Sequence, residues 1–488
     1  PSLREASNLL SLSSLKMAAS LASLPSRALS TSSAALRTIS NVDLREITFP
    51  IAGKAPKVTT ADKAVEQIKS GDSIFVHGIA ATPTPLLNAL CDHASKNNLD
   101  KITLHHLHLE GEARWLEDKY NKRIRSNSLF TGHNLRKGVN EGLVDFNSTF
   151  LSEVPLLFRR KAIPLNVSLI QVSPPDENGF CSLGTSVDTA PAAIKNSQLI
   201  IAMCNKNMPR TFGDSLIHQS HIDYLVETHD HKLHQRNIGA QSEQERTIGK
   251  IIAEKLVDNG ATLQMGIGAI PDAALAALGG HRDLGIHSEM FSDGVLDLIK
   301  SNVITNRFKT TFPGKMTVSF VYGTTKLYDF LNDNPFVHFG DVQWVNDPAY
   351  VRKMRKMTAI NSAVEVDLTG QIVADSVGAR FLSGFGGQVD FLRGAAVSDD
   401  GFGKPIIAIP AITKKGVSKI VPFIKQGAGV VTSRAHAHYI VTEFGIAQMW
   451  GRNMRQRAYE LINIAHPDTR QDLEKAAFER LKCMPSRD

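Results

Sequence analysis

The sequence has few cysteines, few aromatic residues and no long apolar run. Four cysteines lie far apart in 488 residues, at Cys91, Cys181, Cys204 and Cys483. This excludes a disulfide scaffold and a cysteine zinc site, and it is typical of a reducing compartment. No apolar run approaches the roughly 18 residues of a membrane span. The net charge of +7 is small for a chain of this length, whereas a nucleic-acid-binding surface clusters its Lys and Arg residues on one face. With 42% apolar residues, the sequence predicts a globular protein with no membrane span and no nucleic-acid partner.

The first 40 residues differ in composition from the rest of the chain. From Met17 to Ser40 the chain is rich in Ser, Ala and Leu and has two arginines and no acid. Such a segment is typical of a mitochondrial transit peptide, and a disordered Ser-rich tail is the alternative. We expect residues 1–40 to be a leader outside the fold, with Met17 as the natural start. The expected destination is the mitochondrial matrix.

A pattern of strand, glycine loop and helix occurs twice. Residues 63–90 and 251–278 each contain a short helical pattern, a polar turn and an apolar strand, at Ser73–Val76 and Thr262–Met265. A Gly/Ala-rich loop and a proline that opens an apolar helix follow in both copies. Because the copies lie roughly 190 residues apart, too far for a solenoid, the repeat indicates two homologous domains.

The remaining chain also alternates between predicted strands and helices. Residues 166–172 and 197–203 are near-continuous apolar runs, as in parallel sheets that are covered on both faces. The polar stretch 227–246 is the predicted boundary. We therefore predict two tandem open α/β domains with mostly parallel sheets, over residues 41–240 and 241–488. The cleft between them is the expected active site.

Two glycine-rich loops are candidates for ligand binding. Residues 264–271 lead from a strand into a helix, where free backbone N–H groups suit an anionic or carbonyl oxygen. Residues 383–391 hold three glycines in four positions, which allows a close backbone approach. Neither is a G-x-G-x-x-G or P-loop motif, and ligand-free turns are the alternative. No histidine pair has H-E-x-x-H spacing, so no metal is expected.

One acid stands out in an alternating stretch. In residues 359–374, Glu365 falls on the face opposite the apolar valines. It is either an acid on a solvated strand face or, between small and apolar neighbours, a desolvated nucleophile. The residues alone leave both alternatives open.

Six segments together resemble one family, the acetyl-CoA hydrolase/transferase family. They are QVSPPDENGFCSLG (171–184), QMGIGAIPDA (264–273), HSEMFSDGVLDL (287–298), AVEVDLTGQI (363–372), SGFGGQVDFLRGA (383–395) and HYIVTEFGIA (438–447). The resemblance covers about residues 45–480. It implies a fold like that of class I CoA-transferases, with tandem α/β domains.

The resemblance also implies a chemistry and a set of site residues. Glu365 would attack an acyl-CoA thioester and pass through a glutamyl-CoA thioester in a ping-pong CoA transfer. Backbone donors for the oxyanion would come from Gly386 and Gly387. The implied substrate- and CoA-binding residues are Gly78, Thr82, Gln264, Gly266, Gly268, Gly384, Lys404 and Lys414, the lysines meeting CoA phosphates.

The implied partners are an acyl-CoA and small carboxylic acids, with acetate and succinate expected and no cofactor beyond CoA. A homodimer is a further expectation. If water reaches the thioester, the same residues make an acyl-CoA hydrolase. A non-catalytic CoA sensor that kept the fold is the remote alternative.

Overall fold

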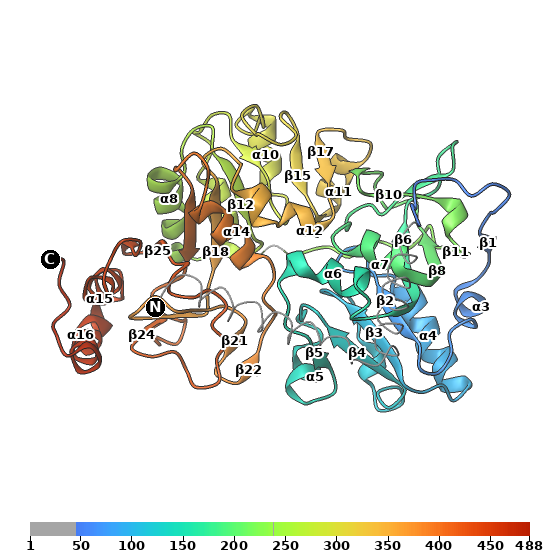
Figure 1. The fold of residues 1–488 in the computed structure, drawn as a ribbon, viewed down its shortest axis with the longest axis horizontal. Helices are drawn as coiled ribbons and strands as arrows, with labels where there is room; N and C mark the ends of the chain where they lie inside the picture. Colours follow the sequence, from blue (N-terminus) through green and yellow to red (C-terminus); the bar gives the residue numbers. More distant parts are fainter. Residues whose placement is uncertain (1–44, 238) are drawn as a thin grey trace, which may run out of the picture. The chain divides into compact units, whose positions relative to one another are not determined.

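The computed structural model describes residues 45–237 and 239–488 (Figure 1). The described chain from Ile47 onward forms one compact unit. The predicted leader over residues 1–40 lies outside the described residues. In the part that is described, no helix combines the length and the apolar character needed to cross a bilayer.

The first sheet has eight strands, all paired in parallel. Its order across the sheet is β1-β11-β8-β6-β2-β3-β4-β5. The strands are β1 (Lys57–Val58), β2 (Ser73–Val76), β3 (Ile102–His106), β4 (Ile124–Ser128), β5 (Asp145–Phe146), β6 (Leu165–Val172), β8 (Ser197–Cys204) and β11 (Tyr224–Glu227).

The second sheet has six strands in the order β13-β12-β18-β23-β25-β26. All neighbours are parallel except the last pair. The strands are β12 (Thr262–Met265), β13 (Gly285–Ile286), β18 (Thr358–Ser362), β23 (Lys404–Ala408), β25 (Tyr439–Thr442) and β26 (Gly445–Gln448).

The two sheets share one strand order. The first contains the run β3-β2-β6-β8-β11 and the second the run β13-β12-β18-β23-β25. In chain order each run reads 2-1-3-4-5, one of the common doubly wound arrangements. Such a sheet binds ligands beyond the carboxyl ends of its strands, where the strand order reverses. Those points lie between β2 and β6 in the first sheet and between β12 and β18 in the second.

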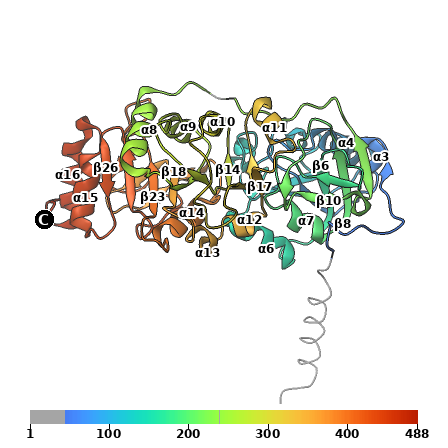
Figure 2. The same ribbon diagram turned by 90° about the horizontal axis from the view of Figure 1, so that it is seen from above.

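Helices cover both faces of each sheet. Figure 2 shows α4 on one face of the first sheet with α6 and α7 on the other, and α8, α9 and α10 opposite α13 and α14 on the second. At the C-terminal end α15 packs on β26 and α16 on α15. The helices are α3 (Ala61–Val65), α4 (Thr84–Lys96), α5 (Arg136–Asn140), α6 (Val154–Arg159), α7 (Ala190–Asn196), α8 (Glu243–Leu256), α9 (Ala269–Ala276), α10 (Val295–Lys300), α11 (Thr325–Leu331), α12 (Val342–Val345), α13 (Pro348–Val351), α14 (Gln388–Ala396), α15 (Met454–Asn463) and α16 (Pro467–Leu481).

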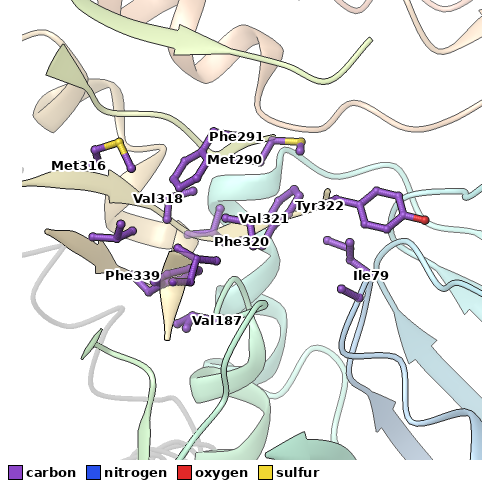
Figure 3. Close-up of a cluster of buried hydrophobic side chains, with 14 of the residues drawn as sticks. Ile79, Val187, Met290, Phe291, Met316, Val318, Phe320, Val321, Tyr322 and Phe339 are labelled. Carbon is purple, nitrogen blue, oxygen red and sulfur yellow. The ribbon is translucent and has the colours of Figure 1, made fainter. Parts of the chain in front are cut away.

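A hydrophobic cluster runs continuously from the first sheet to the second. It includes Phe75 of β2 and Val441 of β25, and near its middle lies the parallel pair β14 (Met290–Phe291) and β16 (Phe320–Val321). Figure 3 shows this middle part, where Phe291, Val318 and Phe339 pack together. This cluster therefore joins the two sheets, and each sheet has a further hydrophobic cluster of its own.

The small sheets are β7 (Phe180–Ser182) with β10 (Leu216–His218), β15 (Met316–Val318) with β17 (Val337–Phe339) and β9 (Phe212–Gly213), β19 (Glu365–Asp367) with β20 (Ile372–Val373) and β24 (Ile420–Val421), and β21 (Ser376–Val377) with β22 (Arg380–Phe381).

The predicted fold class is confirmed. Both repeat strands, β2 and β12, have the predicted bounds, and each is followed by a glycine loop and a helix, α4 or α9. Among the described residues between 228 and 242 none lies in a helix or strand, and helix α8 begins inside the polar stretch 227–246. Because Ile47–Asp488 forms one compact unit, the division of the domains at residue 240 stays a prediction.

Candidate active site

A cavity of about 230 Å³ lies where the carboxyl ends of strands from both sheets meet. This is the position that the strand order predicts for a ligand. Its walls are formed by Ile79, Leu107, His108, Phe130, Leu151, Gln264, Met265, Gly266, Ile267, Pro271, Glu289, Met290, Phe320, Asn361, Ser362, Ala374, Ser383, Gly384, Phe385, Gly386, Gly387 and Gln388.

The polar floor of the cavity lies at the switch point of the second sheet. Gln264 is the last residue but one of strand β12. Asn361 is the last residue but one of the neighbouring strand β18. The Asn361 amide donates a hydrogen bond of 2.9 Å to Gln264 Oε1. These two side chains hold each other at the edge where a ligand would enter.

The first sheet supplies an apolar wall. Ile79 follows β2, Leu107 follows β3 and Phe130 follows β4, so all three lie beyond carboxyl ends of parallel strands. Ile79 belongs to the same hydrophobic cluster as Met290 and Phe320, and Figure 3 shows all three side chains. Such a wall favours the apolar part of a small acyl group over water.

The glycine loop at residues 383–387 closes another side of the cavity and runs into helix α14. Gly386 adopts φ +59°, a conformation that glycine takes at little cost. Its carbonyl oxygen accepts a hydrogen bond of 3.1 Å from the backbone N–H of Leu151. A segment of the first half thereby fixes the position of the loop.

Glu289 is the acid of this cavity. It ends the segment His287–Glu289 between strands β13 and β14, and hydrogen bonds anchor that segment on several sides. His287 Nε2 lies 2.8 Å from the Val345 carbonyl oxygen, and Ser288 Oγ donates to the Met290 carbonyl at 2.6 Å. The Glu289 carbonyl itself accepts the N–H groups of residues 319 and 320. The backbone that carries this carboxylate is therefore rigid.

Neutral donors hold the Glu289 carboxylate. Asn346 Nδ2 donates to Oε2 at 2.8 Å, and the backbone N–H of Gly387 also donates to the carboxylate. The pKa of Glu289 is raised to about 7, mainly by burial and in part by the charge of the nearby Asp390, although the two donors act in the opposite direction. A carboxylate stripped of water and facing no cation is a strong nucleophile once it is ionised.

The close packing at this point explains one glycine. A Cβ placed on Gly387 would overlap Glu289 Oε2 and Asn346 Nδ2. Only a residue without a side chain lets the backbone N–H approach the carboxylate this closely.

Five of the residues predicted from the sequence line the cavity: Gln264, Gly266, Gly384, Gly386 and Gly387. They come from the two glycine loops, which the fold brings together although they are more than 100 positions apart in the sequence.

Five other residues that the sequence predicted for the site do not line this cavity. A Cβ on Gly78 would come within 3.0 Å of a backbone oxygen, and Gly268 caps helix α9. Thr82 Oγ1 donates to the Ile79 carbonyl at 2.8 Å and accepts the N–H of the residue at position 110. Lys404 is paired with an aspartate at 2.7 Å. Lys414 lines a separate shallow cavity. These five residues do not line the main cavity, and their roles in binding substrate or CoA stay predictions.

Glu365 does not line the cavity either. It lies on strand β19 and is 1% exposed. Lys425 donates to both carboxylate oxygens, from its backbone N–H at 2.8 Å and from Nζ at 2.7 Å. Neither the solvated face nor the place beside the glycine loop that we expected for Glu365 is found. Glu289 occupies the place beside the loop.

The sequence did contain a signal for Glu289. It lies in HSEMFSDGVLDL, one of the six segments that carry the family resemblance, yet no role was assigned to it. An acid between short apolar strands, preceded by His and Ser, offers no periodicity. Its proximity to Gly387 appears only in the folded chain.

One group of side chains in the described ranges could hold a metal ion. Ligand atoms of His108, Glu110 and His133 all lie within 4.8 Å of one another. His108 Nε2 and Glu110 Oε1 lie 2.7 Å apart and form an ion pair when His108 is protonated, and only His108 of the three lines the cavity.

The cavity lies between two mostly parallel sheets of the same strand order, and backbone and amide donors hold an ionisable carboxylate in it. This is the arrangement of an α/β enzyme that can catalyse acyl transfer. Models of the acetyl-CoA hydrolase/transferase N-terminal and C-terminal domains match residues 54–234 and 323–477. The chain belongs to the acetyl-CoA hydrolase/transferase family. Glu289 lies between the two matched regions.

Characterised relatives agree with this assignment. A succinyl-CoA:acetate/propanoyl-CoA:succinate CoA transferase of Fasciola hepatica is 52% identical over 90% of this chain and 91% of its own. A 4-hydroxybutyrate coenzyme A transferase of Clostridium kluyveri is 46% identical over 86% of this chain and 96% of its own. The crystal structure of RipA from Yersinia pestis superposes with a TM-score of 0.81 at 33% identity, covering 88% and 98% of the two chains. An acetyl-CoA hydrolase of Saccharomyces cerevisiae is more distant, at 26% identity.

Proposed function

We propose that this protein is a CoA-transferase that uses Glu289 as its nucleophile. The observation that supports this best is the position of that carboxylate in the cavity, against Gly387 and, among the described residues, with no lysine or arginine paired to it. Succinyl-CoA and acetate are the proposed substrate pair, because the relative at 52% identity is named for them. A cavity of about 230 Å³ with apolar walls suits acyl groups of this size.

The reaction proceeds in two halves. Ionised Glu289 attacks the thioester carbonyl of the acyl-CoA, and CoA leaves as a thiolate, which gives an acyl-glutamyl anhydride. The thiolate then attacks the glutamyl carbonyl and releases the first acid, leaving CoA bound to Glu289 as a thioester. A second carboxylate runs both steps in reverse and departs as the new acyl-CoA. The steps need no cofactor beyond CoA itself.

The donors around Glu289 serve each tetrahedral intermediate on the glutamyl carbon. Oε2 of Glu289 accepts a hydrogen bond from Asn346 Nδ2, and the Gly387 N–H also donates to this carboxylate, so neutral donors are in place for an oxyanion that forms there. One such donor is typically worth about 3–4 kcal/mol in the transition state. Gly386 supports this arrangement by anchoring the loop through its carbonyl oxygen.

Hydrolysis is the competing outcome for the same intermediate. If water reached the glutamyl thioester, CoA would be released without an acceptor. The apolar wall of Ile79, Leu107 and Phe130 disfavours water near the intermediate and so supports transfer.

The test separates transferase, hydrolase and sensor. Succinyl-CoA consumption is timed with and without acetate while acetyl-CoA is quantified. Consumption that needs acetate and yields equal acetyl-CoA is the expected result. Consumption that ignores acetate would identify a hydrolase, and binding without consumption a sensor.

We also propose that residues 17–40 direct the protein to mitochondria, because the segment is basic, Ser-rich and free of acids. Fusing residues 17–40 to a fluorescent protein tests this, with Arg27 and Arg37 replaced by Glu as the control. Mitochondrial fluorescence that the control loses is expected, and diffuse fluorescence in both would contradict it. A homodimer remains our expectation for the assembly, measurable by light scattering.

A further inference from the structure

We propose that Asp390 is a positioning residue, which locks a segment of the first half against the residues that hold Glu289. The proposal rests on the nucleophilic role of Glu289. It adds a role for the contact between the halves, namely keeping the glycine loop and the Asn346 amide aimed at one carboxylate.

The contacts of Asp390 with the first half are direct. Asp390 is 6% exposed and lies in the first turn of α14. Ser152 donates to it twice, from Oγ to Oδ1 at 3.0 Å and from its backbone N–H to Oδ2 at 3.3 Å. The neighbouring backbone bond from Leu151 to Gly386 runs in parallel. Three hydrogen bonds thereby tie residues 151–152 to the loop and the helix that follows it.

Asp390 is also linked indirectly to Glu289, through one side chain and through the backbone. The Asn346 side chain, fully buried, hydrogen-bonds to Asp390 as well as to Glu289. Along the backbone, Asp390 lies three residues after Gly387, and the Gly387 carbonyl accepts the N–H of Phe391 at 3.1 Å. A movement of Asp390 would therefore move both donors of Glu289. Displacements of about 1 Å near a reacting group can cost on the order of a hundredfold in rate.

The charges around Asp390 and Glu289 make the role of Asp390 testable through the pH dependence of the reaction. The pKa of Asp390 is raised to about 7, mainly by burial and in part by the charge of Glu153, against the hydrogen bonds from Ser152 and Asn346. The charges that act on Glu289 are those of Asp390 and Asp188, and both raise its pKa. Asp390 therefore makes Glu289 harder to ionise while it holds the donors in place.

The experiment follows formation of the CoA adduct on the protein in single turnovers between about pH 5.5 and 8.5. Asp390→Asn removes the charge and keeps the shape, and Asp390→Ala removes both. Ser152→Ala keeps the carboxyl and deletes one hydrogen bond. Asp399→Asn, a surface carboxylate shortly after the same helix and paired with Arg352, is the matched control.

The wild type should lose rate below about pH 7, because Glu289 must be ionised to attack. In Asp390→Asn this acid limb should move down by up to about one pH unit, because Asn cannot take up the negative charge that Asp390 gains as it titrates near pH 7. Its limiting rate should still fall roughly tenfold, and that of Asp390→Ala about a hundredfold. The KM for acyl-CoA should stay within about twofold. Ser152→Ala should lose a smaller factor with the limb near its wild-type position, and Asp399→Asn should match the wild type.

Two results overturn parts of the account separately. If the wild type forms no adduct at Glu289, the proposed function fails. If the wild type forms the adduct but Asp390→Asn has an unmoved acid limb and Asp390→Ala an unchanged rate, the positioning role of Asp390 fails alone. A purely structural role would lower the melting temperature of the Asp390 variants without moving the limb, and this also contradicts the proposal.

Discussion

Two glutamates of the second half, Glu365 buried and Glu289 partly buried, have opposite environments. Glu365 receives a lysine ammonium and a backbone N–H from Lys425, so its charge is neutralised within an ion pair. Glu289 receives only an amide and a backbone N–H from neutral groups, and it borders a cavity. A carboxylate that is paired with a cation is a weak nucleophile, because the cation stabilises its charge. A carboxylate that is desolvated and not paired with a cation is a stronger one.

The comparison teaches that burial alone does not identify a nucleophile. What separates the two residues is the charge of the donors and the presence of open space at the oxygen atoms. Both are properties of neighbours far away in the chain, Lys425 for one glutamate and Asn346 with Gly387 for the other.

The largest expected effect comes from removing the reactive carboxylate. Glu289→Ala should lower the rate of CoA transfer by on the order of 10⁴-fold or more, because no other group can form the covalent intermediate. Steady-state transfer from succinyl-CoA to acetate measures this, with acyl-CoA binding by calorimetry as the check on folding. A variant that binds and still transfers at near the wild-type rate would remove Glu289 from the mechanism.

The next effect comes from the backbone donor. Gly387→Ala places a methyl group against Glu289 Oε2 and Asn346 Nδ2, so transfer should fall by roughly 10²–10³-fold. Gly280→Ala is the control, because a Cβ there meets nothing within 4 Å. Equal activities of these two variants would show that the approach of Gly387 to the carboxylate is unimportant.

A third prediction uses the pH dependence of stability. The folded-state pKa of Glu289 is raised to about 7, so its contribution to stability is fully present below the unfolded pKa of about 4.5 and is lost as pH rises through 7. Glu289→Gln should therefore raise the melting temperature by roughly 2 °C at pH 8 and leave it unchanged near pH 4.5. A destabilised variant at pH 8 would mean that the carboxylate is not desolvated in the fold.

The smallest effect on activity is expected at the other glutamate. Glu365→Gln should leave the transfer rate within about threefold, because Glu365 does not border the cavity. It should lower the unfolding free energy by about 1 kcal/mol, a modest cost because half-exposed Lys425 is screened by solvent. Chemical denaturation and the transfer assay measure the two quantities. A loss of activity comparable to that of Glu289→Ala, with stability retained, would restore Glu365 as the nucleophile.

Much of the fold could be predicted from local patterns. Strands β2 and β12 have the predicted bounds because each is a compact apolar run followed by glycine and then a proline that opens a helix. Since both strands sit at the same place in their sheets, the repeat also predicted the duplication. The cavity then follows from the rule that ligands bind beyond the carboxyl ends of strands.

The acid that we propose as the nucleophile, Glu289, could not be predicted in the same way. Alternation in residues 359–374 drew attention to Glu365, but alternation does not show that Lys425, 60 positions later, would neutralise it. Glu289 follows a two-residue strand, β13, which is too short to give a periodic signal. The same limit applies to the lysines expected at the CoA phosphates: Lys404 is paired with Asp258, and a charge in a sequence does not show its partner.

The most direct measurement is the site of covalent CoA attachment. The protein is incubated with succinyl-CoA without an acceptor, digested at low pH and analysed by mass spectrometry. We predict a CoA-sized adduct on the peptide that contains Glu289, absent in Glu289→Gln and discharged by acetate. An adduct on the peptide that contains Glu365, or one that persists in Glu289→Gln, would contradict the account.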